Sequence, residues 1–326
     1  MEKPSNLLLK LSRQLFTDTG EQETFIHSLL TPKKFNPCIL WTQEKPQTLP
    51  FETAPALSWQ PHFIDRLSPT EKPGKHPLHE QGYYYCLDFS SVFAASSLLS
   101  IKEPVNIIFD MCAAPGGKSI FAWKSLQPQL LLCNEVISKR IGMLISNIKR
   151  CQIQPCAVLN RDPEFFGEII PQTAQVVLVD APCSGQSLIA KGEKADGCFH
   201  PVNINKNANR QKRIIANAAH IVAPQGYLAY TTCTYSPEEN EKIGDWFISK
   251  FPHFQPQQIP HLTPHQSHLT DLACYRMWPH TGEGAGAFTI LFKNTNSEPA
   301  KQLPSNFWDE NSFRFINRTN AKNPLS

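Results

Sequence analysis

Short apolar runs alternate with segments of helical periodicity from about residue 101 onward, and this alternation restricts the fold more than any other feature. It is typical of the α/β class, in which helices join the strands of a parallel sheet. Strands are expected at residues 105–110, 130–135, 156–160, 176–180, 227–232 and 288–292. Helices are expected at residues 138–150, 207–222 and 238–250. The sequence therefore predicts a doubly wound, Rossmann-like sheet with ligands at the carboxyl ends of its strands.

The two ends of the chain differ from this central part in composition and periodicity. Residues 1–82 begin with a helical pattern and continue as proline-rich, weakly periodic sequence, which indicates a small N-terminal accessory domain. Residues 294–326 are rich in Asn, Ser and Pro and are expected to form a polar C-terminal tail that docks loosely. The central domain is then expected to span residues 83–293.

The composition is that of a globular protein, with 41% hydrophobic and 18% charged residues. The net charge of +3 permits a nucleic-acid partner through a local patch but does not by itself indicate one. The sequence shows no signal-peptide pattern and no apolar run of transmembrane length, and its ten cysteines have no regular spacing. We therefore expect a cytoplasmic protein with reduced thiols and no membrane segment. His261, His265 and His268 lack a matching Cys or carboxylate, so no metal site is expected.

The first expected strand leads into a glycine-rich turn, Cys-Ala-Ala-Pro-Gly-Gly-Lys, at residues 112–118. The turn lacks the first glycine of a phosphate loop, and no Gly-x-Gly-x-x-Gly motif is present. A strand, a tight turn and a helix N-terminus remain, and these suit a cofactor that approaches the backbone closely. Glu135 ends the second strand, where it can bind ribose hydroxyls, and Asp162 follows the third, where it can reach an adenine amino group. These features predict an S-adenosylmethionine site. The alternative is that the acidic residues only cap strands and helices. The residues expected to contact the cofactor are Cys112, Ala113, Ala114, Pro115, Gly116, Gly117, Lys118, Glu135, Asp162 and Asp180.

Two cysteines each follow the end of an expected strand. Cys183 lies in Asp180-Ala-Pro-Cys-Ser-Gly, and Cys233 lies in Thr-Thr-Cys-Thr ahead of Glu238-Glu-Asn-Glu. Strand-end thiols with a nearby carboxylate and a cofactor loop indicate covalent catalysis on an electrophilic ring. The alternative for Cys183 is a small buried apolar side chain.

These motifs together resemble those of the RNA 5-methylcytosine methyltransferases, the Nol/Nop/Sun family, and particularly its bacterial 16S ribosomal RNA members. The resemblance rests on residues 73–77 with 82–84, 112–119, 180–185, 232–234 with 238–241, and 276–280 with 284–288. It implies a class I S-adenosylmethionine-dependent methyltransferase fold over residues 83–293, with an N-terminal domain that contacts RNA. The implied activity is cytosine C5 methylation of small-subunit ribosomal RNA or, alternatively, of transfer RNA. The sequence departs from the family pattern at residues 87–90, 186–187 and 191–202, which concern the RNA-contacting loop rather than the chemistry.

The resemblance also implies roles for four residues. Cys233 would add to C6 of the cytosine and Cys183 would assist product release, whereas DNA cytosine methyltransferases attack with the Pro-Cys thiol. Asp180 would stabilise the activated ring near N3 and the exocyclic amine, and Lys118 would act near O2. The presence of all four argues against the rival interpretation, a non-catalytic RNA-binding ribosome-assembly protein of the same fold.

Basic residues gather on two of the expected helices. They are Lys139, Arg140, Lys149 and Arg150 on one helix, and Lys206, Arg210, Lys212 and Arg213 on the other. With Lys72 and Lys75 they are candidates for contacts with RNA phosphates, although a solvated surface is the commoner explanation of such runs. RNA is thus the expected partner, and the protein is expected to be a monomer.

Overall fold

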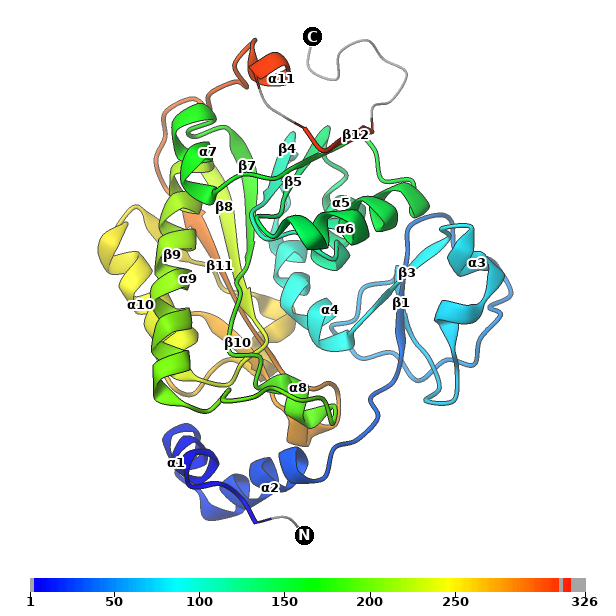
Figure 1. Cartoon of the computed structure of the whole chain (residues 1–326), viewed down its shortest axis with the longest axis vertical. Coiled ribbons are helices and arrows are strands. Elements are labelled where there is room, and N and C mark those ends of the chain that lie inside the picture. The colour runs from blue at the N-terminus through cyan, green and yellow to red at the C-terminus, as the bar shows by residue number, and fades with distance from the viewer. Residues whose placement is uncertain (1–2, 311–312, 318–326) are drawn as a thin grey trace.

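A single large sheet forms the centre of the computed structural model, which describes residues 3–310 and 313–317 (Figure 1). Within these residues the sheet has nine strands in the order β10-β11-β8-β7-β4-β5-β6-β12, with β9 paired to β11. The central strands run parallel: β4 (Ile107–Asp110), β5 (Leu130–Asn134), β6 (Cys156–Leu159), β7 (Ala174–Asp180) and β8 (Val222–Thr232). The flanking strands are antiparallel to their neighbours: β9 (Phe254–Pro256), β10 (Cys274–Met277), β11 (Ala287–Asn294) and β12 (Phe315–Asn317). The α/β class and the Rossmann-like arrangement expected from the sequence are confirmed.

The chain starts this sheet in the middle and extends it in two directions. β4 is followed by β5 and β6 on one side, and the chain then returns to β7 and β8 on the other. In such sheets ligands bind where the strand order reverses, outside the carboxyl ends of the two innermost strands. Here those strands are β4 and β7, which end at Asp110 and Asp180. The topology thus selects one end of the sheet as the place for a site.

Helices cover both faces of the sheet, so its central strands are buried on both sides. Successive residues of a strand point to opposite faces: Ile108 belongs to one hydrophobic core with Phe121, whereas Phe109 belongs to the other core with Phe166. One face carries α4 (Phe89–Ser96), α5 (Gly117–Leu126) and α6 (Ser138–Arg150). The other face carries α7 (Pro163–Ile169), α9 (Pro201–Ile221) and α10 (Glu241–Lys250).

Two helices begin at residues other than those expected. α9 starts at Pro201, ahead of the expected residue 207, because the His200 side chain accepts a hydrogen bond from the Val202 N–H and caps the helix. α10 starts at Glu241 instead of residue 238, after a 3-10 turn at Pro237–Glu239. The short strands β9, β10 and β12 were not expected from the sequence.

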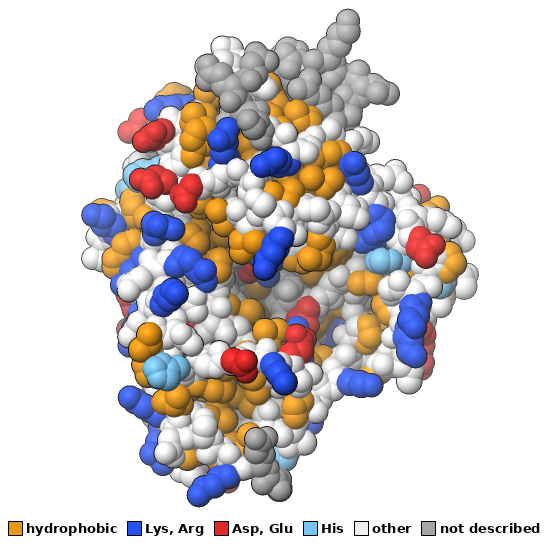
Figure 2. All heavy atoms as spheres, viewed as in Figure 1, with side chains coloured by type: hydrophobic (Ala, Val, Ile, Leu, Met, Phe, Trp, Pro, Cys, Tyr) orange, Lys and Arg blue, Asp and Glu red, His pale blue; other side chains and the backbone are white. Residues whose placement is uncertain are grey.

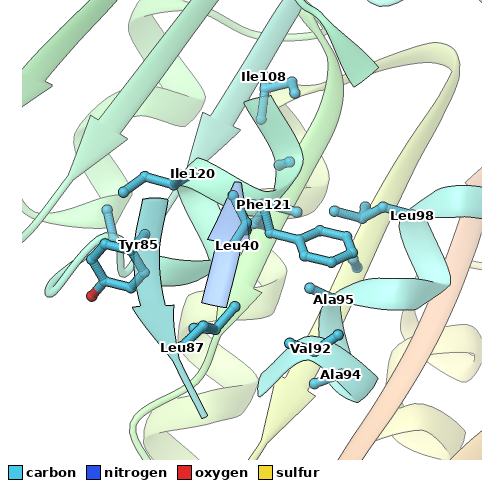
Figure 3. Packing of buried hydrophobic residues seen from close by; sticks show 14 of the residues in the cluster. Leu40, Tyr85, Leu87, Val92, Ala94, Ala95, Leu98, Ile108, Ile120 and Phe121 are labelled. Carbon is cyan, nitrogen blue, oxygen red and sulfur yellow. The ribbon is translucent and has the colours of Figure 1, made fainter. Parts of the chain in front are cut away.

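The small sheet of the N-terminal part packs against the helix that follows the glycine-rich turn. It consists of β1 (Cys38–Trp41), β2 (Ile64–Arg66) and β3 (Tyr84–Leu87), all antiparallel, with α3 (Pro77–Glu80) ahead of β3. Figure 3 shows Leu40, Tyr85 and Leu87 of this sheet in one cluster with Ile120 and Phe121 of α5. The small sheet continues to Leu87, beyond the domain boundary expected at residue 82. That boundary stays a prediction.

The first two helices lie apart from this small sheet, at the end of the molecule where the N-terminus is found (Figure 1). They are α1 (Asn6–Leu15) and α2 (Thr19–Leu30). The Phe25 ring lies 5.1 Å from that of Tyr235, and the Phe16 ring lies 4.8 Å from that of Trp278. The N-terminal part therefore contacts the rest of the chain at two separate places.

The described part of residues 294–326 contacts an edge of the main sheet. Phe307, at the start of α11 (Phe307–Glu310), is buried, and β12 pairs with β6. Residues 311–312 and 318–326 lie outside the described residues, so the expected polar tail is placed only in part. None of the described helices is long and apolar enough to cross a membrane.

Candidate active site

The carboxyl ends of β7 and β8 bring together residues that are fifty positions apart in the sequence. The parallel register pairs Asp180 with Thr231, and the Thr231 hydroxyl donates a hydrogen bond to Asp180 Oδ1 at 2.9 Å. Each strand then leads into a loop that carries a cysteine, and the Sγ atoms of Cys183 and Cys233 lie 3.3 Å apart. The pairing of two strands thus converts two distant sequence motifs into one pair of thiols.

Lys118 joins this site from the first turn of α5. Its Nζ lies 2.8 Å from Asp180 Oδ2, so that the two carboxylate oxygens of Asp180 are held by Thr231 and Lys118. Burial lowers the pKa of Lys118, but the adjacent Asp180 carboxylate outweighs this effect and holds the pKa above its ordinary value. Lys118 therefore remains a cation, and the structure places all four expected catalytic residues in one group.

The two thiols differ in their ease of ionisation. The two sulfur atoms share a hydrogen bond in which either thiol can be the donor, and this bond lowers the pKa of Cys233 against the opposing effects of burial and Asp180. The same bond, together with burial, raises the pKa of Cys183 well above its ordinary value. Cys233 is also the more exposed of the two. Because the thiolate is the reactive form, the direction of these pKa shifts and its greater exposure make Cys233 the candidate nucleophile of the pair.

A buried carboxylate, Glu239, connects the two cysteine loops. It accepts hydrogen bonds from the Ser184 N–H at 2.9 Å, the Ser184 hydroxyl at 2.5 Å and the Gln211 side-chain amide at 2.9 Å. The Ser184 hydroxyl also lies 2.7 Å from Thr234 Oγ1, next to Cys233. Burial raises the pKa of Glu239, and the hydrogen bonds that it accepts oppose this rise. From the sequence, Glu239 was expected at a helix N-terminus and was given no role in the site.

The glycine-rich turn needs its two glycines for different reasons. Gly116 has a φ of +112°, which L side chains rarely adopt. A Cβ on Gly117 would lie 2.6 Å from Leu87 Cδ1 and 3.2 Å from Tyr85 Cε1. The second glycine therefore keeps the start of α5 close to β3, where a side chain would not fit.

A pocket lies between this turn and the start of α4, with a volume of about 240 Å³. Asp110, at its base, is fully buried and accepts hydrogen bonds from the Ser119 hydroxyl at 2.6 Å and the Cys112 N–H at 3.1 Å. Burial raises the pKa of Asp110 to about 7, although these hydrogen bonds oppose the rise. The pocket is lined by Tyr85, Cys86, Leu87, Asp88, Ser91, Asp110, Cys112, Ala113, Pro115, Gly117, Lys118 and Asp180.

Half of this lining was not anticipated from the sequence. Residues 87–90 were treated only as a departure from a family pattern, although Asp88 carries a recognisable signal. It directly precedes α4, and its side chain caps that helix by accepting a hydrogen bond from the Ser90 N–H at 2.9 Å. Ala114 and Gly116, which were expected to contact a cofactor, shape the turn without lining the pocket.

Glu135 and Asp162 do not line this pocket, and both carboxylates have other partners. Glu135 is buried at the end of β5, where it accepts a hydrogen bond from the Ile137 N–H at 2.8 Å and lies 3.2 Å from the Arg140 guanidinium. Asp162 caps α7 by accepting from the Glu164 N–H at 3.1 Å. These contacts agree with the capping alternative, and cofactor binding by the two residues stays a prediction.

The expected basic helix faces are divided by their contacts. On α6, Arg140 donates to the Ala114 carbonyl oxygen, Arg150 donates to that of His79, and Lys149 lies over the Phe315 ring at 5.0 Å. These three cations therefore have partners within the chain. On α9, Lys212 lies over the Trp246 ring at 5.5 Å, whereas the hollow beside Cys183 is lined by Lys206, Arg210 and Arg213.

Comparison with known proteins relates the chain to methyltransferases. Residues 97–293 match the family model described as 16S rRNA methyltransferase RsmB/F. The ribosomal RNA small subunit methyltransferase F of Psychromonas ingrahamii is 33% identical over 229 residues, which are 69% of this chain and 48% of that protein. The chain spans about half the length of the curated relatives it matches.

Solved structures share the fold at low sequence identity. The NSun6 protein of Pyrococcus horikoshii, crystallised with SFG, has a TM-score of 0.70 at 18% identity and covers 90% of this chain and 99% of its own. A methyltransferase homolog from the same organism has a TM-score of 0.72 at 20% identity and covers 89% of this chain and 95% of its own. At these identities the likeness concerns the fold alone.

Proposed function

We propose that this chain, which belongs to the 16S rRNA methyltransferase RsmB/F family, transfers a methyl group from S-adenosylmethionine to C5 of a cytosine in small-subunit ribosomal RNA. The observation that carries the proposal is the distance of 3.3 Å between the sulfur atoms of Cys183 and Cys233, beside the ion pair of Asp180 and Lys118. Covalent catalysis on a pyrimidine ring requires a nucleophile and groups that stabilise the charge of the activated ring. The thiol pair can supply the first, and the carboxylate and the cation can supply the second.

The residues around the glycine-rich turn suit the proposed cofactor. Gly117 lines the pocket beside Leu87 and Tyr85, and the turn ends at the N-terminus of α5. Bound S-adenosylmethionine supplies an electrophilic methyl group. We propose that residues 112–118 and Asp180 hold this cofactor, with Glu135 and Asp162 at its ribose and adenine. The support for the last two is their position after β5 and β6, at the same end of the sheet.

In the proposed reaction Cys233 is the nucleophile. Its thiolate adds to C6 of the cytosine and forms a C–S bond, which gives C5 the electrons to take the methyl group. The bond between that methyl group and the cofactor's sulfur would break, leaving S-adenosylhomocysteine. Asp180 and Lys118 stabilise the activated ring from the side of N3, the exocyclic amine and O2. The C5 proton is then lost to solvent, its electron pair restores the double bond between C5 and C6, and the C–S bond breaks with its electrons returning to the Cys233 sulfur. Cys183, whose raised pKa suits a group that binds a proton firmly, assists this release.

We also propose that residues 1–82 contact the RNA and that the chain acts as a monomer in the cytoplasm. Support for the RNA contact comes from the small sheet, whose β1 residue Leu40 packs with Ile120 and Phe121 of α5, the helix that follows the glycine-rich turn. Such a contact would place RNA over the strand ends that carry the thiols.

The proposed function is tested by methyl transfer from tritiated S-adenosylmethionine to RNA from a deletion strain, with bisulfite sequencing of the same RNA. We expect the full chain to label the small-subunit ribosomal RNA, and the deletion to remove one or more 5-methylcytosine marks from it. The Cys183→Ala/Cys233→Ala double variant is the matched control and should transfer no label. Label in transfer RNA alone would make that RNA the substrate, and no label in either RNA would favour a non-catalytic RNA-binding protein.

A further inference from the structure

A second hollow lies beside the thiol pair and is not used by the proposed reaction. Its volume of about 560 Å³ falls within the range of about 300–1,000 Å³ that is usual for ligand sites. Cys183 and Ser184 form part of its wall, and the opposite wall is the N-terminal half of α9. The hollow therefore opens next to the place where a target base would react.

Three exposed cations of α9 face this hollow. Lys206, Arg210 and Arg213 are spaced by four and three residues, so they lie on one side of the helix. None of the ion pairs found among residues 3–310 and 313–317 involves them. Arg210 donates a hydrogen bond to Asn207 Oδ1 at 2.7 Å, and Asp196 is the acidic residue of the lining. Three cations and one carboxylate leave the hollow with an excess of two positive charges.

The position of Lys212 shows that the charges of α9 are not spread evenly around the helix. Lys212 follows Arg210 by two residues, and its ammonium group lies over the Trp246 ring of α10 at 5.5 Å. Figure 2 shows several Lys and Arg side chains on the part of this face where α9 lies. A basic helix that was merely solvated would not need to concentrate its unpaired cations at the opening beside Cys183.

Other cations close to the thiols are already neutralised. Lys118 is paired with Asp180 at 2.8 Å, and Lys191 is paired with Asp88 at 2.7 Å. A nucleotide whose base reaches Cys233 carries phosphates one sugar away from that base, and these phosphates require cations at the edge of the site. The unpaired cations of α9 meet this requirement.

We propose, on the basis of the proposed function, that Lys206, Arg210 and Arg213 bind the sugar–phosphate backbone of the single-stranded RNA that flanks the target cytosine. Contacts with phosphates position the strand without reading its sequence. Because the target base must leave its stack to react, the strand beside it is distorted, and α9 holds it in that state.

The test compares the Lys206→Gln/Arg210→Gln/Arg213→Gln variant with Lys212→Gln, which removes one positive charge from the other side of the same helix. A short fluorescent single-stranded RNA containing cytosine is titrated with each protein at several salt concentrations. Each phosphate contact with a single strand contributes about 0.7 to the slope of log K against log salt. The triple variant should therefore lose roughly 2 from this slope, whereas Lys212→Gln should keep the parent slope. An RNA with uracil in place of cytosine should show the same loss.

The outcomes separate this proposal from the proposed function. Equal salt slopes for the triple variant and Lys212→Gln, with a parent chain that methylates RNA, would overturn the α9 contact and leave the function intact. A parent chain that methylates no RNA would remove the function and, with it, the α9 proposal. Because the three side chains are exposed, the triple variant should fold, and unchanged S-adenosylmethionine affinity in calorimetry checks this.

Discussion

Replacing Glu239 with alanine removes the carboxylate that joins the two cysteine loops. Three hydrogen bonds are lost, two from Ser184 and one from Gln211. The Ser184 hydroxyl keeps its contact with Thr234, and the Gln211 amide keeps the Pro182 carbonyl oxygen at 3.0 Å. The Ser184 N–H is then left without the acceptor that it has in the structure.

The cost of this change follows from these partners. A hydrogen bond to a charged group contributes about 1.5–3 kcal/mol, and a buried donor left without a partner costs about 1–3 kcal/mol. With one donor orphaned and two further hydrogen bonds lost from donors that keep another partner, the free energy of unfolding should fall by about 3–5 kcal/mol in Glu239→Ala. The neighbouring Glu238 accepts hydrogen bonds from Gln14, Ser236 and Lys242 near the surface, so Glu238→Ala should cost about 1–2 kcal/mol, less than Glu239→Ala.

Urea unfolding followed by tryptophan fluorescence measures both variants. Methyl transfer should fall strongly in Glu239→Ala because Ser184 adjoins Cys183, while S-adenosylmethionine affinity stays near that of the parent. Equal unfolding free energies for Glu239→Ala and Glu238→Ala would show that the buried carboxylate does not hold the loops as described.

Three further predictions concern the carboxylates of the cofactor pocket and its surroundings. In calorimetry, Glu135→Ala or Asp162→Ala should reduce the affinity for S-adenosylmethionine about tenfold or more, whereas Cys233→Ala should leave it unchanged. Unchanged affinity in both acidic variants would contradict the assignment of Glu135 and Asp162 to the cofactor site. Asp180→Asn should lower methyl transfer at least about a hundredfold while RNA binding survives, and near-normal tritium transfer would remove Asp180 from the catalytic set. Burial raises the pKa of Asp110 from 3.8 to about 7, so the folded chain holds a proton that the unfolded chain lacks, and stability falls as pH rises through this window. In urea titrations between pH 5 and 7, the free energy of unfolding of Asp110→Asn should fall with pH less steeply than that of the parent, by up to about 1.4 kcal/mol per pH unit. A difference in unfolding free energy between variant and parent that does not change with pH would contradict this prediction.

The central strands could be predicted from the sequence because each is a short apolar run between turn residues. The central residues of β5 and β7, 130–133 and 176–179, are buried and apolar without alternation. The edge strands β9 and β12 have three residues each, which is too short for a periodic pattern to appear. They form because partners distant in the sequence, β11 and β6, offer free edges.

The start of α10 shows how a tertiary contact overrides a local signal. Pro237 followed by two glutamates satisfies the rules for a helix N-terminus. In the structure the Glu239 side chain turns inward to Ser184, and Asn240 takes a φ of −119° and a ψ of −100°, so the helix begins at Glu241. A local pattern cannot report a bond to a residue fifty-five positions away.

The candidate site was predicted as a set of residues but not as a set of contacts. Asp180, Cys183 and Cys233 could be selected because each stands at or just after a strand end. The hydrogen bond from Thr231 to Asp180 depends on the register between β7 and β8, which residue spacing does not reveal.

The most direct test of the proposed mechanism asks which cysteine forms the covalent bond to RNA. Cys183→Ala, incubated with small-subunit ribosomal RNA and S-adenosylmethionine, should accumulate a protein–RNA complex that survives denaturing electrophoresis, because Cys233 still attacks and release fails. Cys233→Ala and the Cys183→Ala/Cys233→Ala double variant should give no such complex and no methylated product. A complex that accumulates in Cys233→Ala but not in Cys183→Ala would reverse the two roles and contradict the assignment of Cys233 as the nucleophile.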